Sequence, residues 1–378
     1  MKTRLITAFI ILFTISQSCK KDTPQLTEKE EVFYALPTLP ATPFNYVNQA
    51  VPSYIKPFTL ESDNTPDDNP VTDHGATLGR VLFYEKNLSI NNSISCGSCH
   101  VQKFAFSDTN TLSNGFDGGL TARHSMSLTY AKYYQPGHFF WDTRAATLED
   151  QVLMPVEDPV EMGMTVTKVI ERLGEIPFYE QLFVNAFGDS KITELRIRKA
   201  LAQFIRSINT YDSKFDEGMR LTGNANLNFP NFSPIENNGK RLFLGRAGCV
   251  PCHGSNLQIA IEPENNGLDS IITDNGLYDV TLRDSDRGRF KVGSLRNIAL
   301  TAPYMHDGRF KTLLEVVEHY NSKVKKSPTL STILRDQNGE PIRLNLNELE
   351  KQSIVLFLKT LTDSSSLRHE KFSDPFMD

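Results

Sequence analysis

Apolar positions recur at helical spacing in several separated parts of this chain. The first such pattern begins near His74 and continues with apolar residues on one side, at Leu78, Val81 and Leu82. Residues 193–210 repeat the pattern with Leu195, Ile197, Leu201, Phe204, Ile205 and Ile208. Residues 347–362 follow it again, and Asn347 stands where it can cap the first turn. Because strand signals are sparse, the pattern predicts a mainly α architecture.

Polar stretches separate these helical patterns and suggest the domain organisation. Residues 19–70 are rich in Pro, Thr, Asn and Asp, a composition typical of a tether followed by an irregular arm. Residues 222–236 contain four Asn and two Pro. We therefore predict one domain over residues 71–225 and a second over residues 226–378.

The two predicted domains carry similar segments in the same order. Residues 79–83 (GRVLF) correspond to residues 239–243 (GKRLF), and each segment precedes a C-x-x-C-H string. Further along, residues 141–148 (WDTRAATL) match residues 306–313 (HDGRFKTL) at an offset of 165. Shared features in one order indicate duplication of a single unit.

The N-terminus has the features of an export signal. Lys2 and Arg4 precede an apolar run over residues 6–15, which is too short to span a bilayer and is typical of a signal peptide covering residues 1–18. Ser18 directly before Cys19 favours lipoprotein processing with a lipid on Cys19, and ordinary cleavage near Ser18 is the alternative. Either process predicts a protein on the periplasmic side of a bacterial membrane, anchored there if Cys19 is lipidated.

Composition and charge narrow the classes of partner. Charged residues make up 22% of the chain and apolar residues 39%, as in a soluble globular protein. The formal net charge of −5 argues against nucleic acid as a partner. The same charge is compatible with docking a basic electron donor.

Four of the five cysteines stand in two C-x-x-C-H strings. One string is Cys96, Cys99 and His100, and the other is Cys249, Cys252 and His253. In such a string the two thiols form thioether bonds to haem and the histidine binds the iron. A redox dithiol or a zinc site are the alternatives, but neither explains both trailing histidines. The strings predict two covalently bound haems c.

The residue opposite each proximal histidine decides whether a haem relays electrons or binds a substrate. In the second domain the candidates for that position are Met305, His306, His319 and Tyr320. The repeat offset pairs Tyr320 with Pro155, and proline cannot bind iron. Ligation by Tyr320 would therefore give a closed second haem and an open first one. His124 and His138 leave this argument open, because either could close the first haem.

Two polar residues and a tryptophan lie near Pro155. A carboxylate such as Glu161 beside an open haem can take a proton from bound peroxide and return it to the leaving oxygen. Gln151 lies on the same segment, which follows Trp141, the only tryptophan of the chain. The alternatives are a solvated loop position for Glu161 and core packing for Trp141.

Several strings together resemble one known family. Over residues 71–362 the chain resembles the bacterial dihaem cytochrome c peroxidases, and within them the branch that contains the methylamine-utilisation protein MauG. The strings are residues 78–80 (LGR), 95–100 (SCGSCH), 140–145 (FWDTRA), 159–163 (PVEMG), 295–297 (LRN) and 302–308 (APYMHDG).

The resemblance implies two cytochrome c-like haem domains with different tasks. The N-terminal haem would react with peroxide, and the C-terminal haem would pass electrons to it. The family's tryptophan between the haems matches Trp141, and its catalytic glutamate matches Glu161. Gln151 and Pro155 match the residues that line the distal pocket in the MauG branch.

Two positions distinguish the branches of the family. Typical members place methionine opposite the C-terminal proximal histidine, whereas the matching residue here is Tyr320, as in the MauG branch. A phenolate stabilises higher oxidation states of iron, so a low reduction potential is expected. Many members also cap the resting N-terminal haem with a removable histidine, whose place in the loop 113–118 is taken by Phe116. The first haem should therefore be five-coordinate without activation.

The resemblance also implies a calcium site, with one departure from the family pattern. Thr301 and Pro303 match the positions that supply main-chain carbonyls, but His124 stands where the family has an asparagine. Because calcium prefers oxygen ligands, this substitution argues against a complete site.

These observations predict an oxidoreductase of the cytochrome c peroxidase type. It would reduce hydrogen peroxide with electrons from a small redox protein, either a cytochrome or a cupredoxin. The alternative is a MauG-like oxidation of a protein substrate through a high-valent state of the two haems. A rival from another class is a non-enzymatic electron-transfer cytochrome, in which both irons carry two protein ligands.

Overall fold

The computed structural model describes residues 34–55, 61–134, 137–254 and 262–377. The predicted signal peptide (1–18), Cys19 and the first part of the tether lie outside these residues. Residues Leu36–Asp378 form one unit, in which the predicted boundary between residues 225 and 226 stays a prediction. Within the described ranges no helix is both long and apolar enough to cross a membrane.

Helices and turns make up the described elements, which contain isolated β-bridges but no strand. The predicted mainly α architecture is therefore confirmed. The α-helices are α2 (Asp73–Tyr84), α3 (Cys96–Cys99), α4 (Leu148–Gln151), α5 (Met154–Glu157), α6 (Val166–Glu175), α7 (Pro177–Phe187), α8 (Glu194–Ser207), α9 (Lys214–Thr222), α10 (Pro234–Leu244), α11 (Val250–His253), α12 (Tyr278–Thr281), α13 (Leu313–Glu318), α14 (Glu348–Lys359) and α15 (Ser364–Leu367). One π-helical turn, η6 (His319–Lys323), directly follows α13. The 3₁₀ turns are η1 (Lys86–Leu88), η2 (Gln102–Phe104), η3 (Ala131–Tyr133), η4 (Asp284–Asp286), η5 (Ile298–Leu300), η7 (Thr332–Leu334) and η8 (Glu370–Phe372).

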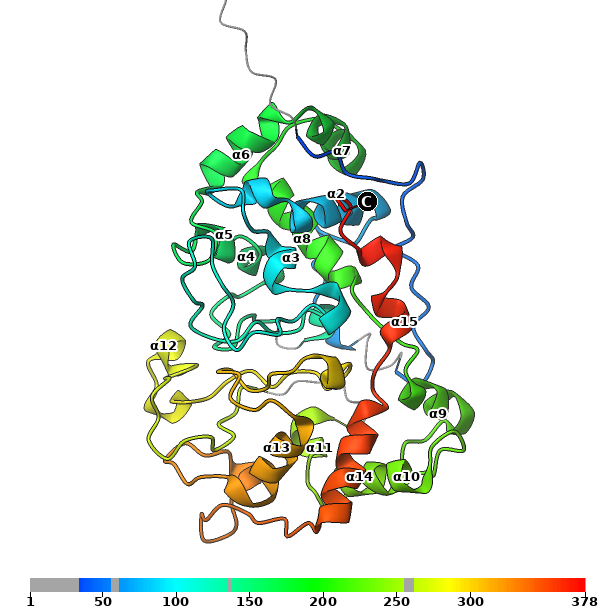
Figure 1. Cartoon of the computed structure of the whole chain (residues 1–378), viewed down its shortest axis with the longest axis vertical. Coiled ribbons are helices and arrows are strands. Elements are labelled where there is room, and N and C mark those ends of the chain that lie inside the picture. Colours follow the sequence, from blue (N-terminus) through cyan, green and yellow to red (C-terminus); the bar gives the residue numbers. More distant parts are fainter. Residues whose placement is uncertain (1–33, 56–60, 135–136, 255–261, 378) are drawn as a thin grey trace, which may run out of the picture. The chain divides into compact units, whose positions relative to one another are not determined.

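A close helix pair, α2 against α8, supports the first half of the chain (Figure 1). A Cβ atom on Gly79 would lie only 2.0 Å from the carbonyl oxygen of Ala200, so the two main chains meet where no side chain fits. Phe83 and Phe204 pack beside this contact with ring centroids 5.3 Å apart. Thr72 caps α2, and its hydroxyl accepts a hydrogen bond from the amide of Gly75. The helices predicted near His74 and over residues 193–210 are confirmed.

The second half repeats this arrangement with α10 against α14 (Figure 1). A Cβ atom on Gly239 would lie 1.8 Å from the carbonyl oxygen of Ser353. Phe243 and Phe357 pack beside it, again with centroids 5.3 Å apart. Asn347 caps α14 as predicted, because its side chain accepts from the amide of Glu350. Equivalent contacts at equivalent positions are the structural counterpart of the repeated sequence segments.

The structural similarity of the two halves continues after each C-x-x-C-H string and then ends. The bridge between Phe139 and Ala145 has its counterpart between Tyr304 and Phe310, at the same offset as in the sequence. Threonine N-caps begin both α4 and α13. After these caps the halves differ, because α4 is followed by the short helix α5 whereas α13 continues into the π-helical turn η6.

The N-terminal arm and the C-terminal segment both pack on the first half. The amide of Tyr46 donates to Asp73 Oδ1 at 2.7 Å, and its hydroxyl donates to the carbonyl of Lys371 at 2.6 Å. The hydroxyl of Tyr84 on α2 donates to the carbonyl of Phe372 at 2.7 Å. The ends of the described chain therefore close over the helix pair α2–α8.

The helix contact at Gly79 provides a test of this packing. We expect Gly79→Ala to lower the free energy of unfolding by roughly 1–3 kcal/mol, because the added methyl group forces α2 away from α8. Gly174 is the matched control, since it lies in α6 and a Cβ atom added there would have no neighbour within 4 Å. Gly174→Ala should be neutral or slightly stabilising. Urea unfolding followed by circular dichroism measures both, and equal stability of the two variants would contradict this account.

Candidate haem and peroxide site

The first C-x-x-C-H string forms the one-turn helix α3 and the residue after it. The amide of Ser95 donates to the hydroxyl of Ser98 at 3.0 Å, which stabilises the turn that holds both cysteines. His100 follows directly, and its Nδ1 lies 2.9 Å from the carbonyl oxygen of Phe106. Burial lowers the pKa of His100, so the imidazole is neutral and donates from Nδ1. Its Nε2 lone pair is left for a metal.

The second string also forms a one-turn helix, α11, which begins one residue later in the string. Cys249 precedes α11, and His253 ends it. Burial lowers the pKa of His253 to about 4, so this imidazole is also neutral. Burial likewise raises the pKa of Cys249 to about 12 and that of Cys252 to about 11. Neutral imidazoles and buried thiols beside them are the donor set that covalent haem attachment requires.

The alternative uses of the cysteines receive no support from the geometry. The four cysteines of the two strings form no disulfide in the described part of the chain. Within the same residues, no three side chains of His, Cys, Asp or Glu gather closely enough to hold a metal ion. A zinc site at either string would need such a cluster.

Two adjoining cavities lie between the first string and Trp141. The larger has a volume of about 350 Å³ and the smaller about 60 Å³. His100, Gln151, Pro155 and Glu161 line both of them, and Cys96 and Cys99 line the smaller. The larger volume falls in the range of cofactor sites. The cavities bring together the predicted residues of the first haem site, and their donor set fits a flat macrocycle held at one edge by two thiols.

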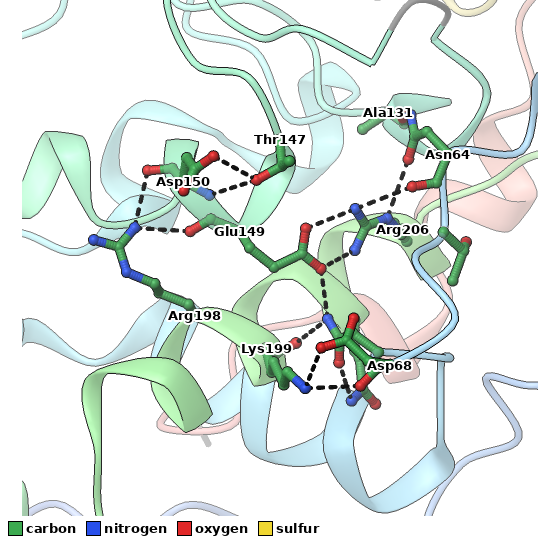
Figure 2. Close-up of polar contacts among 12 residues, drawn as sticks. Asn64, Asp68, Ala131, Thr147, Glu149, Asp150, Arg198, Lys199 and Arg206 are labelled. Carbon is green, nitrogen blue, oxygen red and sulfur yellow. Dashed lines mark hydrogen bonds and ion pairs between the residues drawn. The ribbon is translucent and has the colours of Figure 1, made fainter.

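An ion-pair network fixes the segment that carries Gln151. Arg206 on α8 is only 1% exposed and forms an ion pair with Glu149 on α4 (Figure 2). One nitrogen of Arg206 lies 2.9 Å from Glu149 Oε2. From the other side Arg198 donates to the main-chain carbonyl of Glu149 at 2.9 Å. The helix that presents Gln151 to the cavity is thus tied to the helix pair α2–α8.

Glu161 lies in the turn after α5, and the main chain around it is held tightly. The carboxylate of Asp158 accepts from the amides of Val160 and Glu161, at 2.8 and 3.1 Å. Burial raises the pKa of Glu161 to about 7, the charge of Asp158 adds to the rise and Arg144 opposes it. Glu161 in turn contributes to the raised pKa values of Cys96 and Cys99, whose main cause is burial. Its carboxyl group therefore faces the first string and is no solvated loop acid.

Phe116 occupies the loop position at which the family resemblance implies a removable histidine in other members. Its amide donates to the carbonyl of Glu161 at 2.9 Å, and its ring packs against Gly163, where a Cβ atom would lie 2.5 Å from it. Asn91 holds the loop from outside by donating to the carbonyl of Phe116 at 2.9 Å. The ring has no group that can bind iron, and it does not line either cavity.

From the sequence alone, His124 and His138 are the two residues that could bind the iron of the first haem opposite His100. His124 lines the larger cavity, but its Nδ1 lies 3.1 Å from the carbonyl oxygen of Asn110 and its Nε2 lies 3.3 Å from Ser107 Oγ. His138 is exposed and lines neither cavity. Both nitrogens of His124 therefore have partners within the protein, and His138 lies outside both cavities.

Trp141 lies where residues of the two halves meet. Its Nε1 donates to the carbonyl of His124 at 2.7 Å, and its own carbonyl accepts from the amide of Lys291 at 2.8 Å. The indole edge faces His306 with centroids 6.4 Å apart, and it also lines the larger cavity. His306 stacks on Phe290 at 3.7 Å. Trp141 thus touches the first cavity on one side and second-half residues on the other.

Tyr320 faces the second string from the π-helical turn η6. Burial raises its pKa to about 12, Asn266 opposes the rise, and the nearby Cys252 and Cys249 thiols add to it. The three other candidates for this position have partners of their own. His319 Nε2 lies 3.0 Å from the carbonyl oxygen of Asn266, the sulfur of Met305 accepts from the Asn266 side-chain amide at 3.3 Å, and His306 stacks on Phe290. π-helical turns are rare in proteins and are frequently found at functional sites.

The predicted calcium site stays a prediction. Thr301 is buried and Pro303 follows a cis peptide bond, but no oxygen ligand comes from His124, whose nitrogens have the partners described above. The amide of His124 donates to the carbonyl of His306 at 2.7 Å.

Sequence reasoning missed several residues that the fold brings to the larger cavity. They are Arg123, Tyr130, Tyr134, Phe139, Arg144 and Lys291. Arg123 forms ion pairs with Asp142 at 2.5 Å and Asp274 at 2.7 Å, so it joins the two halves beside Trp141. Most of these residues belong to no motif, and their roles depend on long-range packing.

A helical fold with two C-x-x-C-H strings defines a class, the c-type cytochromes with two haems. Residues 73–224 match the family model described as di-haem cytochrome c peroxidase. The chain is 35% identical over 298 residues to cytochrome c551 peroxidase of Nitrosomonas europaea, covering 76% of this chain and 79% of the relative. It is 32% identical over 320 residues to methylamine utilization protein MauG of Methylorubrum extorquens, covering 80% and 82%.

Solved structures agree with these relatives. A MauG-like protein associated with microbial copper homeostasis superposes with a TM-score of 0.75 at 32% identity, covering 87% of this chain and 99% of that one. The chain belongs to the di-haem cytochrome c peroxidase family. It is an oxidoreductase of that family, and the predicted resemblance is confirmed.

Removal of one cysteine pair tests the attachment sites. We expect Cys96→Ala combined with Cys99→Ala to leave one covalent haem, bound by the second string, because thioether bonds need the thiols of each string. Mass spectrometry of the intact protein and the pyridine haemochrome spectrum both count the haems. The matching change at Cys249 and Cys252 should leave the other haem, and two haems in either variant would contradict the assignment.

Proposed function

We propose that this protein reduces hydrogen peroxide in the cavity beside His100, using electrons that arrive through the second haem site. The observation that carries the proposal is the Glu161 carboxyl group, which has a pKa of about 7 in a cavity shared with His100. An acid with a pKa near the working pH can both accept and return a proton. Pro155, at the position equivalent to Tyr320, leaves the cavity free for the substrate.

In this proposal each string holds one haem. Cys96 and Cys99 would form the thioether bonds of the first haem, and His100 would bind its iron. Cys249, Cys252 and His253 would hold the second haem in the same way, with the Tyr320 oxygen as a further candidate ligand of its iron. When bound, the first haem supplies an iron that binds peroxide and the second supplies electrons.

The side chains in the first cavity then manage protons and orientation. The Glu161 carboxylate accepts the proton of the bound peroxide and returns it to the departing oxygen, so that the O–O bond breaks with loss of water. The Gln151 amide donates a hydrogen bond that orients the peroxide, and Phe116 keeps its loop from blocking the cavity. Trp141 carries electrons between the two sites, a role that its contacts with His124 and Lys291 support.

A second candidate function is the oxidation of a protein substrate, which the resemblance to MauG suggests. The observation that favours it is Tyr320 at the second string, because a phenol oxygen stabilises oxidised iron more than a thioether does. In that case the electrons come from side chains of a partner protein. In the peroxidase case they come from a small redox protein, such as a cytochrome or a cupredoxin.

We further propose that the mature protein works on the periplasmic side of a bacterial membrane. The short apolar segment at residues 6–15 and the Ser18–Cys19 pair support export and a lipid on Cys19. Attachment of c-type haem outside the cytoplasm supports the same location. This anchor would hold the peroxide site close to membrane-associated electron donors.

Replacement of Glu161 tests the proton step. We expect Glu161→Gln to slow the reaction of the haem with peroxide by about 10²- to 10⁴-fold, because an amide cannot accept the proton. In the wild type the rate constant should rise with pH through about 7, where burial has placed the pKa of Glu161, as the carboxylate form accumulates. The variant should lose this rise. Stopped-flow absorbance at several pH values measures both effects.

Glu157 provides the control for this experiment. It is an exposed acid on α5 that lines neither cavity, so Glu157→Gln should keep the wild-type rate and pH profile. A Glu161→Gln variant with wild-type kinetics would assign the proton step to another group.

Replacement of Tyr320 tests the second haem site. We expect Tyr320→Met to raise the reduction potential of that haem, because a thioether favours the reduced iron. A spectroscopic redox titration measures the potential, and EPR of the oxidised wild type should show one high-spin and one low-spin haem.

Steady-state turnover with reduced cytochrome c and peroxide separates the two candidate functions: rapid turnover supports the peroxidase, and its absence supports oxidation of a protein substrate. Two low-spin, six-coordinate haems in the wild type would exclude both.

A further inference from the structure

One lysine of the larger cavity has no acidic partner. Within the described residues, three lysine or arginine side chains line this cavity, those of Arg123, Arg144 and Lys291. Both arginines form ion pairs with Asp142, at 2.5 and 3.0 Å. Lys291 forms no ion pair with any acid of the described chain, and burial is the one cause that shifts its pKa. No step of the proposed peroxide reaction uses its ammonium group.

The ammonium group of Lys291 lies over two aromatic rings. Its Nζ is 3.4 Å from the ring centroid of Tyr134 and 4.8 Å from that of Phe139. Ring faces attract a cation, but they do not replace all the water that burial removes. Burial accordingly lowers the pKa of Lys291 to about 7. A carboxylate beside the ammonium group would stabilise its charged form and raise this pKa again.

The hydroxyl group of Tyr134 also lacks a partner. Tyr134 lines the larger cavity and is only 4% exposed, and its hydroxyl is buried without a hydrogen bond to any described residue. A buried hydroxyl without a partner costs free energy, so a native structure normally supplies one. Tyr134 can donate one hydrogen bond and Lys291 can donate three. Together they form the kind of donor pair that binds a carboxylate.

The position of this donor pair indicates which carboxylate it receives. Cys96 and Cys99 line the smaller cavity and not the larger one, whereas Tyr134 and Lys291 line the larger cavity and not the smaller one. Haem c is attached to its cysteines through its former vinyl groups. Its two propionate groups leave the macrocycle at the opposite edge. A haem attached to Cys96 and Cys99 therefore presents its propionates to the part of the larger cavity that lies away from these cysteines.

We propose that Lys291 and Tyr134 bind a propionate group of the first haem. This inference rests on the proposed attachment of that haem to Cys96 and Cys99, and it assigns two residues to the opposite edge of the same haem. It also makes Lys291 a positioning residue. The main-chain amide of Lys291 donates to the carbonyl of Trp141 at 2.8 Å. One residue thus holds both the propionate edge of the haem and the tryptophan through which electrons are proposed to arrive.

Resonance Raman spectroscopy of the haem-loaded protein tests this contact, because the bending frequency of a haem propionate rises when the group accepts stronger hydrogen bonds. We expect Lys291→Met to lower the frequency of one propionate mode, and Tyr134→Phe to lower it by a smaller amount. Lys291→Arg should keep it close to the wild-type value, since a guanidinium group also donates to carboxylates. Tyr134→Phe keeps the ring beneath the ammonium group, so it tests the contact even if Lys291→Met does not fold.

The reduction potential of the first haem provides a second measurement. Loss of a cation beside the haem favours oxidised iron, so Lys291→Met should shift this potential downward and leave that of the second haem unchanged. Lys291→Arg should restore it, which a purely structural role of the side chain would not predict. Lys168 is the control, because it is exposed on α6 and lines neither cavity. Lys168→Met removes the same charge and should leave the potentials and the Raman spectrum as in the wild type.

Failure of this inference and failure of the proposed function give different results. Wild-type propionate modes and potentials in Lys291→Met and Tyr134→Phe would overturn the inference and leave haem attachment and the peroxide reaction standing. A spectral effect of Lys291→Met that appears only when acetate is added would assign the lysine to a free carboxylate, and would also overturn the inference. A wild-type protein without haem at Cys96 and Cys99 would overturn both the inference and the proposed function.

Discussion

The close crossing of two helices at a glycine is the constraint on which this structure depends. At Gly79 and again at Gly239 the main chains of two helices touch. A side chain at either position would therefore collide with a carbonyl of the facing helix. Each crossing fixes a long helix beside a C-x-x-C-H string. Two phenylalanines pack beside each crossing, Phe83 with Phe204 in the first half and Phe243 with Phe357 in the second. One packing solution thus supports two haem sites in a single chain.

The difference between the two sites arises after this common scaffold. Both distal segments begin with a capping threonine, and they diverge only one turn later. In the first half, Pro155 and the tight turn after α5 present Glu161 to the cavity, and burial there gives the carboxyl a pKa of about 7. In the second half the π-helical turn presents Tyr320. A few residues on equivalent helical scaffolds therefore distinguish a site that contains a carboxyl group with a raised pKa from one that contains a buried phenol.

Many of the helices and the residues of the two candidate haem sites could be predicted from the sequence, because the strongest sequence signals are local. Helical periodicity predicted α2, α8 and α14, and the capping role of Asn347 followed from its place before the first turn. The five-residue strings predicted both haem sites, and the repeat offset paired Pro155 with Tyr320. The raised pKa of Glu161 could not be predicted, since it depends on burial by residues far apart in the chain. The same holds for the Arg206–Glu149 pair and for the contact of Lys291 with Tyr134, which form only in the folded protein.

The contacts of Trp141 have a consequence for the timing of electron flow. Hydrogen bonds run from Lys291 to Trp141, from Trp141 to His124 and from His124 to His306, so a continuous ladder crosses between the two halves. Arg123 reinforces it through Asp142 and Asp274. Such a ladder ties the two halves together beside the larger cavity. In the proposed reaction, driving force and reorganisation energy would then govern the rate of electron exchange between the two sites, and no hinge motion would have to precede it.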